Sequence, residues 1–390
     1  MSQVDLSPLF TPLTVRGVTL RNRFVLPAMQ RAWCEDGAPP AAMAEYYRQR
    51  AEGGAALILS EACAVDHVTA TAQPRASRMN AATQEAWAAC FDAAHRHGGR
   101  FFLQLWHEGG SRDPSDGQTI TPSGLLGPDI PAGRIATEAD MQELREAYAR
   151  SARLAVEAGA DGVEVHCCHG YFLDLWLWAK TNRRADGYGG DDVADRVRFP
   201  CEVIAAVRDA VGPDVPVSVR FSQWKEVDYQ ARAAQTPAEL EAMIAAFRRA
   251  GADLVSASTR WFDRPAWPEL DDRLSLAGWV KRVTDAPVVT VGSVGLDVDV
   301  MNSLRGSDVA QGRWEESLAE LMRRFRGGEF DLVAVGRSLI ADPEFVAKVR
   351  DGRYDEIRVF TKADIKDLDA WESELLHAAE RRALEAELGR

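Results

Sequence analysis

Two histidines and a tyrosine stand close together in the stretch EVHCCHGYF, residues 164–172. His166 and His169 are three positions apart, and Tyr171 follows two positions later, after the apolar run VEAGADGVEVH. Such residues can ligate a metal, pack in a core, or act as hydrogen-bond donors to a substrate. Neutral imidazole N–H groups polarise a carbonyl or nitro oxygen, and a phenol delivers a proton.

A metal site is the less favoured of these alternatives. The pattern H-x-x-H needs at least one more His, Cys or carboxylate nearby, and usually a helix that carries both histidines on one face. Here the pair falls at a strand end, and no HExxH or second Cys/His pair follows. Core packing is disfavoured as well, since a strand end at the mouth of a barrel seldom buries three polar rings. We therefore expect substrate-facing donors and no metal.

Eight short apolar runs along the chain indicate the strands that would position these residues. Each is nearly continuous in apolar residues, as in a parallel strand buried on both faces; the runs cover residues 23–28, 56–62, 100–106, 161–167, 215–222, 253–258, 287–292 and 331–336. Helical patterns alternate with them, such as residues 141–162, with a stop signal at Gly159, and 236–251, with Thr236 as N-cap and Glu239 three residues on. This order predicts an α/β fold, a single (β/α)8 TIM barrel over residues 1–360, followed by a C-terminal helical extension over 361–390.

The active site of such a barrel lies at the carboxyl ends of its strands. Gly292 and Ser293 follow the seventh strand, and Gly336 and Arg337 follow the eighth. Many barrels bind phosphate with these two loops, so a phosphorylated cofactor or substrate is expected. The connection between these strands, residues 296–316, is longer than a simple link and is expected to fold over one side.

Composition restricts the partners. The net charge of −13 argues against nucleic acid or an anionic membrane surface as the main partner. No apolar run is long enough to cross a membrane, and the first residues lack the pattern of a signal peptide. Six cysteines without a C-x-x-C pair indicate reduced thiols and a cytoplasmic location. We expect a small-molecule substrate and leave a homo-oligomer open.

Several stretches together resemble the Old Yellow Enzyme family of FMN-dependent oxidoreductases, over roughly the first 350 residues. They are LFTPLTVRGVTLRNRFVLPAM, QLW at 104–106, GADGVEVHCCHGYFLDLWLWAKTNRRADGYGG with RVRFP after it, and FDLVAVGRSLIADPEF. The resemblance implies an ene-reductase that takes hydride from NADPH or NADH through FMN and reduces an activated C=C bond, as in an α,β-unsaturated carbonyl compound.

The resemblance also implies roles for individual residues. His166 and His169 would bind the substrate oxygen, and Tyr171 would donate the proton. Residues near the flavin ring would be Ala28, Met29 and Ala62 through their backbone, Gln30 near the C4 carbonyl, and Gln104 and Arg220 on the pyrimidine side. Gly292, Ser293, Gly336 and Arg337 would hold the FMN phosphate. Phe360 would stand where some family members have a tyrosine.

Tryptophans gather at the strand ends and motivate an alternative function. Trp106 and Trp261 are the expected pocket residues among a set that also includes Trp33, Trp176, Trp178, Trp224 and Trp267. Tryptophan faces attract ammonium groups by cation–π contact, and Asp263 beside Trp261 would add a negative charge. The alternative is therefore an FMN-dependent amine dehydrogenase or N-demethylase. A barrel that binds flavin without catalysis is a third reading, which His166, His169, Tyr171 and Arg220 together disfavour.

Overall fold

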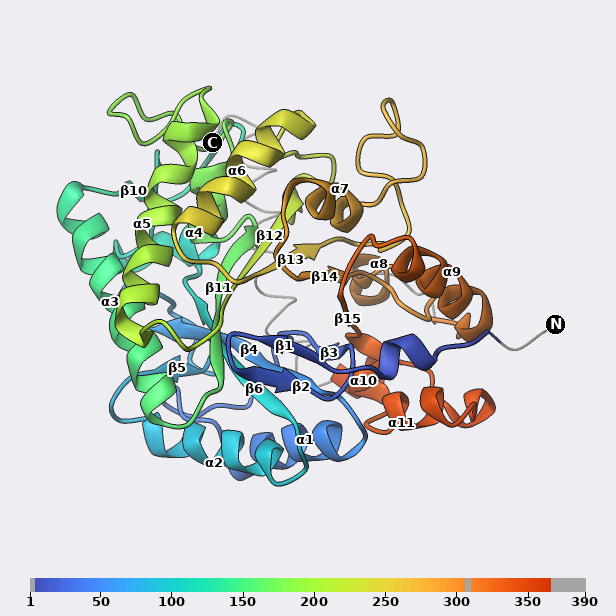
Figure 1. The fold of residues 1–390 in the computed structure, drawn as a ribbon. Coiled ribbons are helices and arrows are strands. Elements are labelled where there is room, and N and C mark those ends of the chain that lie inside the picture. Colours follow the sequence, from blue (N-terminus) through green and yellow to red (C-terminus); the bar gives the residue numbers. More distant parts are fainter. Residues whose placement is uncertain (1–3, 306–309, 366–390) are drawn as a thin grey trace.

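The computed structural model describes residues 4–305 and 310–365, and its centre is a closed barrel of parallel strands surrounded by helices (Figure 1). Neighbouring strands pair in chain order, and the last strand pairs with the first, Val333 beside Phe24 and Ala334 beside Val25. The barrel strands are β3 (Phe24–Leu26), β4 (Leu57–Val65), β6 (Arg100–Trp106), β11 (Gly162–His169), β12 (Val217–Lys225), β13 (Leu254–Ser258), β14 (Val288–Val291) and β15 (Leu332–Ala334). The predicted (β/α)8 barrel is thus confirmed.

Helices pack around the outside of the barrel. They are α1 (Ala41–Glu52), α2 (Gln84–His95), α3 (Glu138–Glu157), α4 (Phe172–Leu177), α5 (Val193–Val211), α6 (Pro237–Arg249), α7 (Leu276–Val283), α8 (Val300–Arg305), α9 (Trp314–Arg326), α10 (Arg337–Ala341) and α11 (Phe345–Arg350). None of those within the described residues combines the length and apolar character that a membrane crossing needs.

Local sequence explains where two of these helices begin. At α6, the Thr236 side chain accepts a hydrogen bond from the Glu239 N–H, as predicted from the sequence. Helix α3 begins three residues before the pattern recognised at Met141. Thr137 and Asp140 form a reciprocal capping box there, with aspartate in the place usually taken by glutamate or glutamine.

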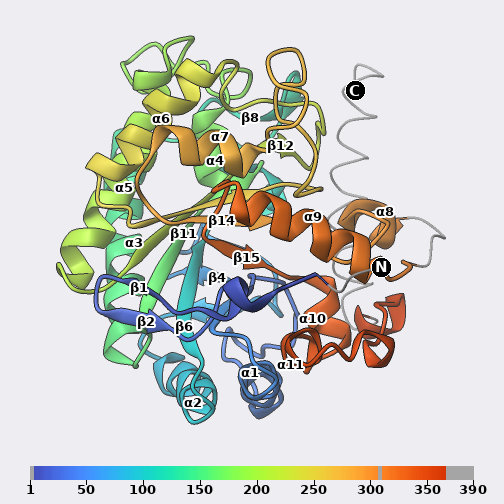
Figure 2. The same cartoon turned by 45° about the vertical axis from the view of Figure 1, so that its right-hand side comes forward.

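Shorter elements close the ends of the barrel. The hairpin of β1 (Leu13–Val15) and β2 (Val18–Leu20) contributes Val15 and Leu20 to an apolar cluster with Val25 and Leu57. Figures 1 and 2 both show α8 and α9 side by side, next to β14 and β15. Helix α8 lies within the long connection expected at residues 296–316, and α9 begins at the end of that connection.

Other short strands lie outside the barrel order: β5 (Arg78–Met79) pairs with β4, and β7 (Ile120–Thr121), β8 (Leu125–Gly127), β9 (Ile130–Pro131) and β10 (Arg134–Ile135) lie in the connection between β6 and α3. Near the end of the described chain, Lys362–Ile365 form a short 3-10 helix, and Ile365 packs with Phe360. The rest of the predicted helical extension, residues 366–390, lies outside the described residues.

Candidate active site

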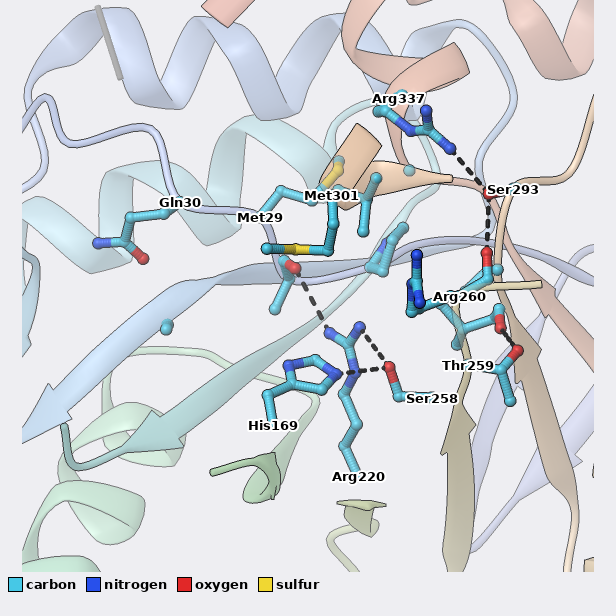
Figure 3. Close-up of a pocket in the computed structure, with 18 of the residues that line it drawn as sticks. Met29, Gln30, His169, Arg220, Ser258, Thr259, Arg260, Ser293, Met301 and Arg337 are labelled. Carbon is cyan, nitrogen blue, oxygen red and sulfur yellow. Dashed lines mark hydrogen bonds between the residues drawn. The ribbon is translucent and has the colours of Figure 1, made fainter. Parts of the chain in front are cut away.

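A cavity of about 250 Å³ opens at the carboxyl ends of the barrel strands. It gathers nearly all of the residues predicted from the sequence: Ala28, Met29, Gln30, Ala62, Gln104, Trp106, His166, His169, Tyr171, Arg220, Gly292, Ser293, Gly336, Arg337 and Phe360. Val300 and Met301 of α8 also line it, so the long connection does fold over one side of the site (Figure 3).

Arg337 lies at one end of the cavity, where the chain leaves β15. Its guanidinium donates to the Ser293 hydroxyl at 2.8 Å, to the Val298 carbonyl at 2.6 Å and to the Ser303 hydroxyl (Figure 3). Burial is the main reason that the pKa of Arg337 is lowered, to about 10. A buried cation whose described hydrogen-bond partners are all neutral is well suited to an anion such as phosphate.

Gly292 lets the backbone pass close to its neighbours beside this arginine. Its φ is 144°, and a Cβ there would lie 2.7 Å from both the carbonyl oxygen and the Oγ1 of Thr259. The Ser293 hydroxyl donates to the Arg260 carbonyl at 2.8 Å, and the Arg260 side chain pairs with Asp299 at 2.9 Å. The loops after β13, β14 and β15 are therefore joined by hydrogen bonds at one end of the cavity. We call this end, which contains Arg260, Gly292, Ser293 and Arg337, the anion-binding end.

Arg220 lies in the middle of the cavity and comes from β12. Its guanidinium donates to the Ser258 hydroxyl at 3.1 Å and to the Ala28 carbonyl at 3.4 Å (Figure 3). Its Nε is buried without a hydrogen-bond partner among the described residues. A buried N–H donor without a partner is costly, so a ligand acceptor is expected at this position.

Gln104 is held by a buried carboxyl group. Its Nε2 donates to Glu164 Oε1 at 2.7 Å, and the Ser218 hydroxyl donates to Glu164 Oε2 at 2.8 Å. Burial raises the pKa of Glu164, while the charge of Arg220 opposes that rise. With one of its two N–H groups committed to Glu164, Gln104 keeps its carbonyl oxygen as an acceptor for a ligand N–H.

Gln30 lines the cavity in a different way. Both polar atoms of its side-chain amide are buried without a partner among the described residues. In Figure 3 the side chain extends away from Arg220 and Arg337. The nearby chain is fixed by the buried Glu61, whose carboxylate accepts the Arg31 N–H at 2.7 Å.

Both histidines come from β11, and Figure 3 shows His169 beside Arg220 and Ser258, away from Arg337. His169 has a φ of 64°, and the pairing of β11 with β12 shifts register between Cys167 and His169. Burial, and then the charge of Arg220, lower the pKa of His166 to about 3 and that of His169 well below its usual value. Both imidazoles are therefore neutral near pH 7, and each can offer an N–H donor rather than a positive charge.

Ser258 indicates which nitrogen of His169 carries the proton. The Ser258 hydroxyl lies 2.9 Å from His169 Nε2 and accepts a hydrogen bond from Arg220 (Figure 3). Because the guanidinium only donates, the single hydroxyl hydrogen is available to Nε2. This arrangement favours the Nδ1–H tautomer of His169.

Tyr171 is packed against His166 and Trp106. It immediately precedes α4, and its ring meets those of His166 and Trp106 edge-on, with centroids 5.3 Å and 5.4 Å apart. These contacts place a phenol and two imidazoles on one side of the cavity. The spacing recognised in the sequence therefore corresponds to one cluster.

The tryptophans do not form the aromatic box that the alternative function required. Of the seven at strand ends, only Trp106 and Trp224 line the cavity. Trp261 lies outside the lining, with the Arg264 guanidinium 4.4 Å from its ring centroid. Trp176, Trp178 and Trp267 are buried in the core. The sequence placed each after a strand but did not reveal the direction of its side chain.

Other residues that line the cavity were not singled out from the sequence. Among them are Ser258 at the end of β13, Thr259 and Arg260 after it, Glu226 after β12, and Val300 and Met301 in α8. Residues 258–260 are within reach of the sequence, because they end or follow a recognised strand. The sequence pattern assigns the phosphate site to the loops after the last two strands alone.

Cys168 changes the argument about metal binding. Its Sγ lies 3.4 Å from His166 Nε2, and one side-chain ligand atom from each of His166, Cys168 and His169 falls within 4.8 Å of the others. The third ligand that the H-x-x-H pattern lacked is therefore present in the fold.

The cavity residues fit FMN. Arg337, Ser293 and the Gly292 backbone would hold its phosphate, and Arg220 and Gln104 offer an unpaired donor and an acceptor to the polar edge of the ring. The orphaned Arg220 Nε is the observation that most requires a ligand, because nothing else among the described residues satisfies it.

Comparisons with known proteins agree with this fit. Residues 8–325 match the model of the NADH:flavin oxidoreductase / NADH oxidase family. An NADH oxidase of Thermoanaerobacter brockii is 31% identical over 90% of this chain, which spans only 52% of that protein. 12-Oxophytodienoate reductase 7 of Oryza sativa subsp. japonica is 30% identical over 88% of both chains.

A solved structure of morphinone reductase in complex with tetrahydroNAD superposes with a TM-score of 0.71, at 26% identity over 88% of this chain and 90% of that one. The family match, the shared fold and the residues that line the cavity all agree. This chain belongs to the NADH:flavin oxidoreductase / NADH oxidase family, whose Old Yellow Enzyme members share its FMN-binding barrel.

Proposed function

We propose that this protein uses FMN to move hydride from NADPH or NADH to an activated C=C bond, as in an α,β-unsaturated carbonyl compound. The observation that carries the proposal is one cavity with an anion clamp at Arg337, a donor–acceptor pair at Arg220 and Gln104, and the cluster of His166, His169 and Tyr171. The names of the relatives, an NADH oxidase and a 12-oxophytodienoate reductase, support it.

The two imidazoles would bind the substrate oxygen. Negative charge develops on that oxygen as hydride reaches the β-carbon, and preorganised N–H donors stabilise it. One such donor is typically worth about 3 kcal/mol of transition-state free energy. Because the pKa values of both histidines are lowered, the imidazoles are neutral near pH 7 and would act on the oxygen as hydrogen-bond donors, not as acids.

Tyr171 would complete the addition. Its phenol gives a proton to the α-carbon while the β-carbon gains the hydride, and water returns a proton to the phenolate. One C=C π bond is lost, and two C–H bonds form. The edge-on contacts with His166 and Trp106 hold the phenol beside the oxygen-binding end of the site.

Bound FMN supplies the two-electron carrier that receives hydride from the nicotinamide and passes it to the substrate. Arg220 would stabilise the negative charge that the reduced ring carries on its polar edge. Its position is fixed by Ser258 and the Ala28 carbonyl, so this stabilisation needs no rearrangement.

Anaerobic stopped-flow mixing of the FMN-loaded protein tests the proposal. NADPH or NADH should bleach the flavin absorbance, and cyclohexenone should restore it. In His166→Ala/His169→Ala, bleaching should persist while reoxidation by cyclohexenone slows at least a hundredfold; His97→Ala, outside the cavity lining, should match the parent protein. Bleaching by N-methyl amines instead of nicotinamides would overturn the proposal, as would reoxidation unaffected by loss of both histidines.

Amine oxidation receives less support from the site. Trp261 does not line the cavity, and Asp263, which was to supply the negative charge beside it, is exposed and also outside the lining. The cationic Arg220 lies where an ammonium substrate would have to approach the histidines.

A further inference from the structure

His166, Cys168 and His169 form a compact group of nitrogen and sulfur ligands at the end of β11. We propose that this group is an inhibitory binding site for a thiophilic closed-shell cation, with Zn²⁺ as the expected ion. Its ligand atoms lie within 4.8 Å of one another. The metal binding itself is independent of the reaction proposed above, whereas its inhibitory effect rests on that reaction.

The backbone of β11 explains why the three side chains meet. In a regular strand, residues 166 and 168 would share one face and residue 169 would point to the other. Here the register with β12 shifts between Cys167 and His169, and His169 adopts a φ of 64°. The turn brings the His169 ring back to within 5.6 Å of the His166 ring, centroid to centroid. Sequence spacing alone would not place three ligands on one side.

The separations suit tetrahedral zinc. Bonds of about 2.0 Å to nitrogen and about 2.3 Å to sulfur place two ligand atoms about 3.5 Å apart. Cys168 Sγ and His166 Nε2 are already 3.4 Å apart. The remaining separations are within 4.8 Å, so those side chains would move closer together on binding. Three protein ligands with one open position are the usual arrangement of a zinc site that exchanges its fourth ligand.

The open position would face the cavity. His166 and His169 line it, whereas Cys168 lies behind them and is fully buried. A cation held by all three would therefore occupy the imidazole edges that are proposed to bind the substrate oxygen. Inhibition should be competitive with the enone and should leave reduction of the flavin by NADPH largely intact.

The charges around the ligand group determine which ions it can bind. Arg220 approaches His169 through Ser258, so a cation here works against a nearby positive charge. Zinc binds cysteine as the thiolate, so binding would release the Cys168 proton and provide one compensating negative charge. Hard, oxygen-preferring ions such as Mg²⁺ gain nothing from sulfur and should not bind.

Zn²⁺ and Cd²⁺ titrations of the FMN-loaded protein in chelator-free buffer test the proposal. Cd²⁺ should produce an ultraviolet sulfur-to-metal charge-transfer band with one ion per chain, and Zn²⁺ should displace it. Cys168→Ala should abolish the band and raise the Zn²⁺ concentration for half-inhibition at least tenfold, each rate being normalised to that variant without metal. Mg²⁺ at equal concentration should have no effect.

Cys167→Ala is the matched control. Cys167 is equally buried and adjacent in the chain, but it is not part of the ligand group, so its variant should keep both the band and the inhibition. Cys201→Ala checks the one half-exposed thiol in the same way. Unchanged Zn²⁺ inhibition in Cys168→Ala, or no binding of Cd²⁺ at all, would overturn the metal site. A band without inhibition would leave the site in place and count against the substrate role of the histidines.

Discussion

Asp174 and Lys225 form an ion pair at 2.7 Å, and neither side chain is exposed to solvent. The other Asp174 oxygen accepts the Gly170 N–H at 2.6 Å, and Lys225 also donates to the Ser222 carbonyl at 3.1 Å. The pair thus links α4 to the end of β12 directly beneath the turn that carries His169 and Tyr171. The pair supports that turn from outside the cavity, because neither Asp174 nor Lys225 is among the described residues that line it.

Loss of one partner of this pair should be costly. Lys225→Met leaves the Asp174 carboxyl buried without its cation, and such a change typically lowers the free energy of unfolding by about 3–5 kcal/mol. Lys225→Met/Asp174→Leu should recover much of the loss, because the unpaired charge is gone. Denaturant unfolding of the FMN-loaded proteins measures both. Equal stability of the parent protein and Lys225→Met would show that the pair contributes nothing.

Stability should fall as the pH falls below about 6.5, in part because of His166. The pKa of this histidine is about 3 in the folded protein, with burial the main cause, against about 6.5 in an unfolded chain. Between these values only the unfolded state binds the proton, so acid favours unfolding. The slope contributed is at most about 1.4 kcal/mol per pH unit. His166→Asn should therefore show a shallower decline of unfolding free energy between pH 6.5 and 4; parallel curves would contradict the buried, neutral state.

Arg337 should dominate the affinity for FMN. Hydrogen bonds to charged groups contribute about 1.5–3 kcal/mol each, so Arg337→Ala should raise the Kd at least tenfold. Arg337→Lys should be intermediate, because lysine keeps the charge but loses the planar fork that reaches Ser293 and Val298 together. Fluorescence titration of FMN into the apoprotein measures this. Arg323→Ala is the control, since Arg323 pairs with Glu320 on the surface of α9; an equal loss there would refute the role of Arg337.

A methyl group at Gly292 should disturb the anion-binding end. In Gly292→Ala the new Cβ would meet Thr259 at 2.7 Å and Phe262 N at 2.9 Å, in addition to the cost of a φ of 144°. Gly159→Ala imposes a similar backbone cost at a φ of 109° but meets nothing within 4 Å. We expect the first variant to lose more thermal stability than the second and, unlike it, to bind FMN more weakly. Indistinguishable melting temperatures and Kd values would count against close packing at Gly292.

The sequence predicted the barrel well because its signals are local and repeated. The eight apolar runs overlap the eight strands, and residues that follow a strand in such a barrel must collect at one mouth. That rule brings Arg337 into the cavity. Gln104 and Arg220 lie within β6 and β12, toward the carboxyl ends of the apolar runs recognised in the sequence, and they line the same cavity although all three are far apart in the chain.

The direction of individual side chains could not be predicted in the same way. Trp224 and Trp261 both follow apolar runs recognised in the sequence, but only Trp224, which lies within β12, lines the cavity. The grouping of Cys168 with the histidines depends on a register shift and a positive φ that the sequence does not announce. Both outcomes are set by tertiary contacts with neighbouring strands, whereas the strands themselves are set by hydrophobic pattern.

The barrel closes where β15 meets β3, through the neighbouring pairs Val333–Phe24 and Ala334–Val25. Ala28 lies just after one of these strands, and Gly336 and Arg337 lie just after the other, so a flavin held by all three would bridge this short junction of the barrel. Loss of the cofactor should therefore speed amide hydrogen exchange first in Phe24–Leu26 and Leu332–Ala334. In this fold the bound flavin would hold the first and last strands of the barrel together.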